Sequence, residues 1–277
     1  MQKIEYCRTY FEPKSTLECG QTFRFYRWKE GYFVCSEYRA CYLYAAGDHT
    51  VIECEDADSD YFFHYFDLER DYSSICGTAR SYGIDAVNRA VTAGQGLRIL
   101  NQNTEETVFS FIVSQNNHIP RIRGIIERLA ASAGEEREFL GEKFYTFPSS
   151  AVLAQKDEEF FSALGAGYRA KYLVHTARAL ASGALNGTED LRGDALRGRL
   201  SLLNGVGPKV ADCVALFAYH DTEAFPVDTW IERVYREDFK GKLTDRRKIS
   251  EYFRNLFGVC GGYIQQYLFY GKREERR

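Results

Sequence analysis

Proline and methionine are scarce in this chain of 277 residues, which holds five prolines and one methionine. No stretch is of low complexity, and no apolar run approaches the ~20 residues that a membrane-spanning helix needs. Residues 1–14 are polar and charged, without the apolar segment of a secretory signal. These absences exclude a disordered, collagen-like or integral membrane protein, and we expect a cytoplasmic location.

Cysteine is present but forms no recognisable ligand pattern. The eight cysteines are scattered and include no C-x-x-C pair, so their spacing matches neither a zinc site nor an iron–sulfur cluster. Without an export signal they are expected to be reduced thiols that serve as small core residues. We therefore predict no metal site and no cofactor.

The charge balance is slightly acidic. The formal net charge is -3 and the isoelectric point is about 6.0, which argues weakly against a nucleic-acid ligand. Acidic residues are densest between Asp48 and Asp71. Any surface that binds a polyanion is therefore expected elsewhere in the chain.

The hydrophobic pattern changes partway along the chain and predicts an α+β protein. Four aromatic-rich segments, 22–28, 32–35, 40–45 and 50–54, alternate like strands and predict an antiparallel meander with one wet face. In the first segment Phe23 and Phe25 alternate with Arg24 and Arg27, which are expected on the polar face. Beyond about Ala86 the apolar spacing is helical, and no further strand is expected. We predict an N-terminal antiparallel sheet domain over 1–90 and an all-α domain over 91–277, with helices near 105–115, 120–129, 160–164, 169–180, 191–202, 209–218, 229–236, 246–257 and 262–270.

The most informative segment is 200–233, LSLLNGVGPKVADCVALFAYHDTEAFPVDTWIER. Gly205 and Gly207 allow a tight turn between two helices, a helical hairpin over 197–218, and Pro208 suits the first turn of its second helix. Unpaired N–H groups at that helix start form an anion site that can hold a DNA phosphate. A Gly-x-Gly sequence alone is more often a plain capped turn.

Two residues of this segment can carry chemistry. Lys209 lies in the first helical turn, where the helix dipole disfavours its positive charge and favours the neutral amine, a nucleophile toward a carbonyl or sugar carbon. Asp228 is expected at a helix start, where a carboxylate can stabilise a developing oxocarbenium ion. Each residue also has a simpler interpretation: Lys209 can be a solvated surface charge, and Asp228 can be the N-cap of a helix.

The residues around these two positions resemble the helix-hairpin-helix DNA glycosylases, and further segments narrow the resemblance to the 8-oxoguanine DNA glycosylase family. Five blocks carry it, in order along nearly the whole chain: GQTFR at 20–24, FSFIVSQNNHIPRI at 109–122, LGAGYRAKY at 164–172, LNGVGPKVADC at 203–213 and FPVD at 225–228. The resemblance implies an enzyme that flips a damaged purine out of duplex DNA.

The resemblance also implies roles for individual residues. Lys209 would be the nucleophile that displaces the base and forms a Schiff base, and Asp228 would stabilise the sugar and orient Lys209. A lysine at this position implies a bifunctional glycosylase and lyase that nicks the strand by β-elimination. The residues that would bind the base are Gly20, Cys213, Pro226, Gln265 and Phe269. For Cys213 a core thiol is an equally good interpretation.

A second set of residues would contact the DNA around the flipped nucleotide. Asn116, Arg121, Tyr168 and Arg169 match residues that fill the gap and hold the cytosine opposite. Gly205, Gly207, Val210 and Trp230 would face the DNA backbone. The chain departs from the family at Trp230, which replaces a common histidine, at His118, which replaces an asparagine, and at Asn204, which replaces a proline.

Two other functions remain open. One is a helix-hairpin-helix glycosylase for another damaged base, although its iron–sulfur subclass would need clustered C-terminal cysteines and only Cys260 is there. The other is a non-catalytic helix-hairpin-helix DNA-binding protein. A phosphate-binding loop of the NTPase type is excluded, because residues 205–209 lack the G-x-x-x-x-G-K-[ST] spacing of that motif. We expect duplex DNA containing 8-oxoguanine as the partner, with the protein acting as a monomer without membrane or obligate protein partners. Through its DNA the cytoplasmic protein is expected to associate with the nucleoid.

Overall fold

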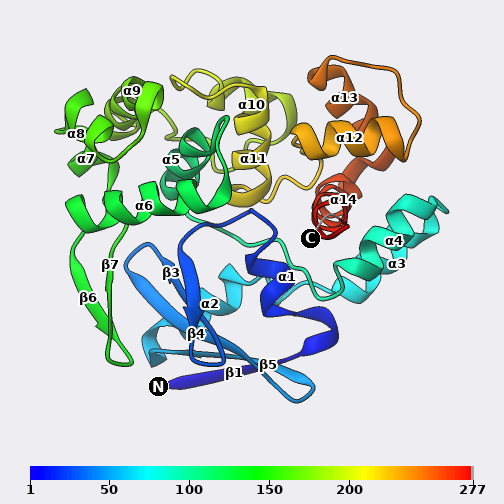
Figure 1. Ribbon diagram of the computed structural model, residues 1–277, viewed down its shortest axis with the longest axis horizontal. Helices are drawn as coiled ribbons and strands as arrows, with labels where there is room; N and C mark the ends of the chain where they lie inside the picture. Colours follow the sequence, from blue (N-terminus) through cyan, green and yellow to red (C-terminus); the bar gives the residue numbers. More distant parts are fainter. Residues whose placement is uncertain (276–277) are drawn as a thin grey trace.

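The computed structural model describes residues 1–275 and has a sheet on one side and a larger helical body on the other (Figure 1). The sheet has five antiparallel strands in the order β1-β5-β4-β3-β2. Their bounds are β1 Gln2–Cys7, β2 Phe25–Trp28, β3 Gly31–Ser36, β4 Arg39–Ala46 and β5 His49–Cys54. The α+β class and the meander are thus confirmed, and β1 is an additional edge strand that the pattern did not indicate.

The prediction of one wet face on this sheet is wrong. All six residues of β3 are buried, which requires cover on both faces. One face packs on α2, Ser59–Tyr65, and the other is covered by a two-stranded hairpin, β6 Glu136–Phe139 and β7 Glu142–Tyr145. The Phe33 ring lies 5.9 Å from the rings of both Phe139 and Phe144. This hairpin also corrects the expectation that no strand follows Ala86.

The first predicted strand begins at Phe25, three residues after its predicted start at residue 22. Residues 20–24 form an irregular segment, and pairing with β3 starts at Phe25. Arg24, expected on a polar face, is fully buried, with Nη1 3.6 Å from Glu106 and further bonds to backbone oxygens of Glu37 and Tyr145. The first of the five family-like blocks, at 20–24, is therefore not a strand but the connection between α1 and β2.

Fourteen α-helices are present among residues 1–275, and the predicted ones are confirmed with shifts of a few residues. The remaining bounds are α1 Pro13–Leu17, α3 Tyr72–Ser81, α4 Asp85–Ala93, α5 Thr104–Ser114, α6 Ile119–Ala133, α7 Ser150–Leu153, α8 Glu158–Ala163, α9 Ala170–Ala181, α10 Gly193–Leu200, α11 Pro208–Ala218, α12 Thr229–Glu237, α13 Arg246–Phe257 and α14 Gly261–Glu274. Among residues 1–275, no helix is both long and apolar enough to cross a membrane.

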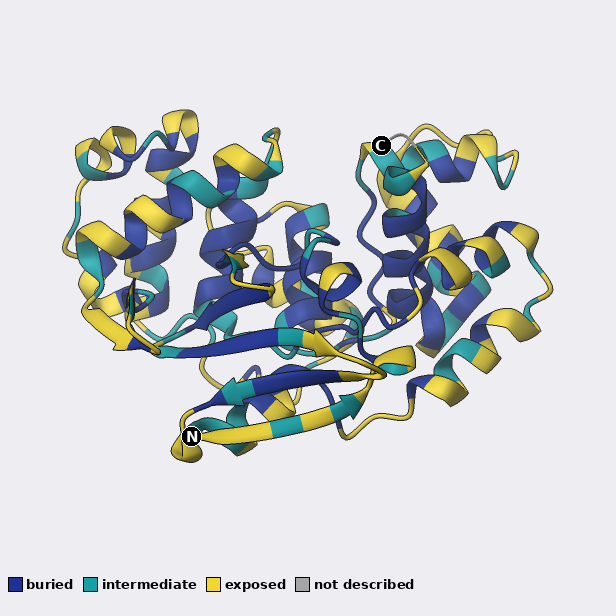
Figure 2. Cartoon of the chain, turned by 60° about the horizontal axis from the view of Figure 1, so that its bottom comes forward, coloured by how far each residue is buried: buried dark blue, intermediate teal, exposed yellow. Residues whose placement is uncertain are grey.

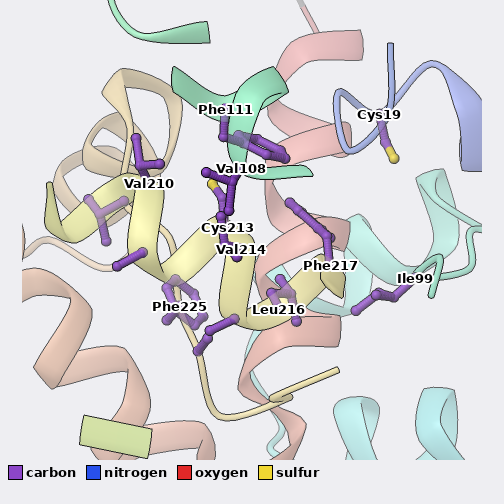
Figure 3. Close-up of a cluster of buried hydrophobic side chains, with 14 of the residues drawn as sticks. Cys19, Ile99, Val108, Phe111, Val210, Cys213, Val214, Leu216, Phe217 and Phe225 are labelled. Atoms are coloured by element: carbon purple, nitrogen blue, oxygen red, sulfur yellow. The ribbon is translucent and has the colours of Figure 1, made fainter. Parts of the chain in front are cut away.

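Helix α11 lies in the centre of the helical body. Every residue from Val210 to Phe217 is buried, and α11 packs against α5, which is buried from Glu106 to Val113 (Figures 2 and 3). Burial of each large apolar side chain there contributes about 1.5–3 kcal/mol. The side chains of α3 and α4 join the same core, and α4 packs on α14. The division of the chain at residue 90 stays a prediction.

Candidate active site and DNA interface

The helical hairpin predicted over 197–218 is confirmed. Helix α10 ends at Leu200, and the turn leads through Gly205, whose φ is +83°, to α11. A Cβ at Gly205 would lie 2.7 Å from the Tyr172 side chain, so both the backbone conformation and the packing require glycine. Gly207 is the N-cap of α11 and makes no side-chain capping bond. The first N–H groups of α11 are therefore available for an anion.

Lys209 lies in the first turn of α11 and is half-buried. Its Nζ is 5.0 Å from the centre of the Phe111 ring, on α5. Cys213, one turn further along α11, is buried; burial raises the pKa of its thiol to about 11, against the opposing charge of Lys209. Lys209 thus lies against an apolar wall that includes the Phe111 ring.

Asp228 is the N-cap of α12. Its Oδ1 accepts hydrogen bonds from the backbone N–H groups of Trp230, at 2.9 Å, and Ile231, at 3.0 Å. The simpler interpretation of this aspartate as a cap is therefore correct, and the capping bonds fix the carboxylate in place. Asp228 also lines the same pocket as Lys209, so capping and a role in the site are compatible.

All seven residues predicted for catalysis and base binding line one pocket. The pocket lies between α11, α14 and the irregular segment after α1, and Figure 3 shows two of its walls, Phe111 and Cys213, with Cys19 approaching from the N-terminal segment. Its lining comprises Cys19, Gly20, Phe111, Lys209, Cys213, Phe217, Pro226, Asp228, Gln265, Gln266 and Phe269. Such a mixture of aromatic walls and few polar groups suits a flat heterocycle.

The polar groups of the pocket are held in place but not saturated. Gln265 is 4% exposed, and its Nε2 donates to the Pro226 carbonyl at 3.1 Å. Its Oε1 is buried and has no hydrogen-bond partner among residues 1–275. A buried acceptor without a partner costs about 1–3 kcal/mol, a cost that a ligand N–H removes. Gly20 has a φ of +80°, and a Cβ there would lie 3.4 Å from the Phe269 ring.

Sequence reasoning missed several groups of the site. Phe111, Phe217 and Cys19 follow core patterns, so no sequence signal separated them from ordinary apolar residues. Gln266 is 3% exposed, and its Oε1 also lacks a hydrogen-bond partner in the described part of the chain; its position beside Gln265 could have indicated it. Arg273 lines the hollow outside the pocket, one helical turn after Phe269, and that spacing was a usable signal.

The residues predicted to face the opposite base gather around the connection between α5 and α6. Asn116 is exposed with a φ of +46°, and exposed Arg121 donates from Nη2 to the Gly165 carbonyl at 3.2 Å. Tyr168 is 51% exposed, just before α9. Arg169 is 3% exposed and donates to the carbonyls of Gln115 and Asn116. The structure therefore places Arg169 behind Asn116 rather than at the surface.

Trp230, the departure from the family pattern, lines the outer hollow together with Lys209, Asp228 and Arg273. The Arg233 guanidinium lies 5.4 Å from the centre of its ring. Among residues 1–275, no group of three histidine, cysteine or acidic side chains could hold a metal ion, and all eight cysteines are free thiols.

Two family models match consecutive parts of the chain. Residues 3–108 match the N-terminal domain of 8-oxoguanine DNA glycosylase, and residues 109–258 match the HhH-GPD superfamily of base excision DNA repair proteins. Together they cover the sheet and most of the helical body, and they include the pocket residues up to Asp228.

Individual relatives agree with these matches. A probable N-glycosylase/DNA lyase of Methanothermobacter thermautotrophicus is 35% identical over 225 residues, 74% of this chain and 70% of that protein. The structure of MBOgg1 with a low-affinity DNA ligand is 37% identical, with a TM-score of 0.94, and covers 100% of this chain and 97% of that one. The 8-oxoguanine glycosylase/lyase of Clostridium acetobutylicum, solved with duplex DNA containing cytosine opposite 8-oxoguanine, is 33% identical, with a TM-score of 0.92 and coverage of 100% and 99%.

Proposed function

The chain belongs to the HhH-GPD superfamily of base excision DNA repair proteins, within its 8-oxoguanine DNA glycosylase family, and from this premise we propose that it is a bifunctional DNA glycosylase and AP lyase. It excises 8-oxoguanine from duplex DNA, with cytosine as the preferred opposite base. The observation that carries this proposal is the single pocket that contains Lys209, Asp228 and the predicted base-binding residues.

The proposed reaction begins at C1′ of the flipped nucleotide. The Lys209 amine forms a bond to C1′, the glycosidic bond breaks, and its electron pair leaves with the base, which takes up a proton. The Asp228 carboxylate, held by its two capping bonds, stabilises the positive charge that develops on the sugar. Opening of the sugar ring gives the Schiff base, and loss of a C2′ proton then expels the 3′ phosphate.

Recognition of the lesion would use the unsatisfied groups of the pocket. Gln265 Oε1 can accept from the Watson–Crick edge of the purine, and Phe269 and Cys213 can cover its two faces. The carbonyl of Gly20 would accept the N7–H that 8-oxoguanine has and guanine lacks. Guanine would instead place two acceptors against each other, which makes discrimination by this one contact physically sound.

Around the flipped nucleotide, we propose that the N–H groups at the start of α11 hold a phosphate, while Asn116, Arg121, Tyr168 and Arg169 serve the opposite cytosine. One chain supplies all of these groups, which supports action as a monomer. Eight free thiols support a reducing, cytoplasmic environment.

Borohydride trapping tests the nucleophile, because it reduces a Schiff base to a stable covalent adduct. We expect the wild-type protein to be trapped on 8-oxoguanine duplex DNA and Lys209→Gln to lose both trapping and base release. Lys248→Gln, at an exposed position on α13, is the matched control and should behave as wild type. Trapping that survives in Lys209→Gln would assign the nucleophile to another residue.

Asp228→Asn separates chemistry from binding. The asparagine oxygen can still cap α12, so the fold is retained. Single-turnover excision should be slowed while affinity for an uncleavable duplex is kept. An unchanged excision rate would remove the assigned role. A wild-type protein that binds 8-oxoguanine DNA but gives neither adduct nor released base would instead favour the non-catalytic DNA-binding alternative.

A further inference from the structure

Gln266 is a second buried amide of the base pocket. It follows Gln265 directly on α14, is 3% exposed and lines the same pocket. Its Oε1, like that of Gln265, is buried and accepts no hydrogen bond from any group within residues 1–275. Among the buried side-chain atoms of these residues that lack a partner, the two glutamine oxygens are the only ones in the pocket. The pocket therefore offers a ligand two acceptors, of which the proposed function uses one.

A third buried glutamine shows that the fold can satisfy such a group. Gln21 is fully buried; its Nε2 donates to the carbonyls of Thr16, at 2.8 Å, and Arg98, at 2.7 Å, and its Oε1 accepts from the Leu100 N–H at 2.9 Å. A buried acceptor without a donor retains the full cost of its desolvation. That cost is left standing only at the two pocket oxygens of this kind, which indicates that their donors belong to the ligand.

The two pocket amides share one aromatic neighbour on α14. Phe269 follows Gln265 by four residues and Gln266 by three, and both spacings place side chains next to each other on a helix. The Gln265 amide is held by the bond from its Nε2 to the Pro226 carbonyl. In the proposed function Phe269 covers one face of the flipped base. An edge of a purine stacked there would lie beside both amides.

The hydrogen-bonding pattern of the base decides which purine suits two acceptors. The oxidised guanine has donors at three positions, N7–H, N1–H and the N2 amino group, and the Gly20 carbonyl is proposed for N7–H. The remaining two are adjacent on the Watson–Crick edge. An oxidised adenine has a bare N1 and no N2 amino group, so its N1 would oppose a glutamine oxygen that gains no donor. Two acceptors therefore match guanine and oppose adenine.

We propose that Gln266 is a specificity-determining residue whose Oε1 accepts one of the two Watson–Crick donors of the oxidised guanine, while Gln265 Oε1 accepts the other. This proposal rests on the proposed function and adds to it a selection between two oxidised purines. The Gly20 carbonyl separates 8-oxoguanine from guanine. The pair of Gln265 and Gln266 separates 8-oxoguanine from 8-oxoadenine.

Binding of base analogues by variants of Gln266 tests this assignment. Each duplex carries cytosine opposite a 2′-fluoroarabino nucleotide, whose fluorine slows cleavage of the glycosidic bond, and the base is 8-oxoguanine, 8-oxohypoxanthine or 8-oxoadenine. Gln266→Met keeps the length of the side chain without its acceptor, and Gln266→Glu keeps an acceptor oxygen. Gln95→Met, at an exposed position after α4, is the matched control.

The measured quantity is the ratio of the dissociation constants for 8-oxoadenine and 8-oxoguanine. Gln266→Met should lower this ratio by about 10- to 100-fold, because it leaves one donor of the guanine unpaired and removes an acceptor that opposes the adenine. Gln266→Glu and Gln95→Met should retain the wild-type ratio. A substitution that only disturbs the pocket would weaken the binding of all three bases together and leave the ratio unchanged.

8-Oxohypoxanthine, which lacks only the N2 amino group, identifies the donor. A loss in Gln266→Met on 8-oxoguanine but not on 8-oxohypoxanthine assigns the N2 amino group, and a loss on both but not on 8-oxoadenine assigns N1–H. Equal losses on all three bases, or none, would overturn the proposal. If Gln266→Met does not fold, Gln266→Ala takes its place with the same outcomes. Failure of the wild type to excise 8-oxoguanine from an ordinary duplex would overturn the proposed function, while the binding ratios remain measurable.

Discussion

Substitution of Asp212 by asparagine should change the pH dependence of stability. Asp212 lies on α11 between Lys209 and Cys213, and it is 5% exposed. The Ser250 hydroxyl donates to its Oδ2 at 3.3 Å, and Arg197 Nε is 3.8 Å from Oδ1. Among the described residues, Oδ1 has no hydrogen-bond partner and is buried. The charged carboxylate is therefore poorly compensated, on the same helix as the proposed nucleophile.

The pKa of Asp212 gives the size and sign of the effect. Burial raises this pKa from 3.8 to about 6, against the opposing charges of Arg197 and Arg254. The folded protein thus holds the proton more tightly than the unfolded chain does. Ionisation costs nothing below pH 3.8 and its full amount above pH 6, so the free energy of unfolding falls as the pH rises between these values. At 1.36 kcal/mol per pKa unit, the full cost is about 3 kcal/mol.

Urea denaturation of the wild type and Asp212→Asn from pH 4 to pH 7 measures this cost. The other titrating groups are common to the two proteins, so their contributions cancel when the two unfolding free energies are subtracted. The unfolding free energy of Asp212→Asn minus that of the wild type should increase by about 2–3 kcal/mol between pH 4 and pH 7. Asp194→Asn is the control: Asp194 contacts the same two arginines, but its side chain is 92% exposed. Its pKa is lowered by Arg197, so that substitution should give no such gain. Parallel stability curves for the wild type and Asp212→Asn would refute the reasoning.

Three further substitutions test other parts of the molecule. Gly205→Ala should lower the unfolding free energy by about 1–3 kcal/mol and weaken duplex binding, since its Cβ would meet Tyr172 at 2.7 Å; thermal denaturation without any loss would contradict this. Arg169→Ala should relax the preference for cytosine when excision is compared across the four opposite bases, and unchanged selectivity would remove that assignment. His220 has a pKa lowered to about 4 by burial, so its contribution to stability is complete above pH 6.5 and is lost as the pH falls toward 4. His220→Gln should flatten this loss in pH-dependent denaturation, while a curve that follows the wild type would exclude His220 as its source.

The helices of the catalytic half were predictable because their apolar spacing is repeated over several turns. Helix α13 begins and ends at the predicted residues, Arg246 and Phe257. Asp228 was predictable as a helix start because the preceding proline and the capping carboxylate are local signals. Features fixed by neighbours in sequence were therefore found without knowledge of the fold.

Features fixed by distant contacts were not found. The β6–β7 hairpin reads EREFLGEKFY, of which half is charged, and only Phe139 and Phe144 are buried against the sheet. Its position depends on Phe33, more than a hundred residues away, which no local pattern reports. Arg24 was expected in water for the same reason, since its partner Glu106 belongs to α5. The sheet was recognisable as a sheet, but the cover on its second face was not.

The proposed selectivity for the lesion depends on a residue outside the pocket. Discrimination by the Gly20 carbonyl is worth about 1–3 kcal/mol only if that carbonyl cannot turn away from guanine. Gln21, the next residue, is fully buried; its Nε2 donates to the carbonyls of Thr16, at 2.8 Å, and Arg98, at 2.7 Å, and its Oε1 accepts from the Leu100 N–H at 2.9 Å. These bonds fix the Gly20 segment to α1 and to the connection between α4 and α5. A flexible segment could move its carbonyl away from guanine at little cost in free energy. The rigidity that Gln21 gives to the Gly20 segment is therefore part of the proposed specificity.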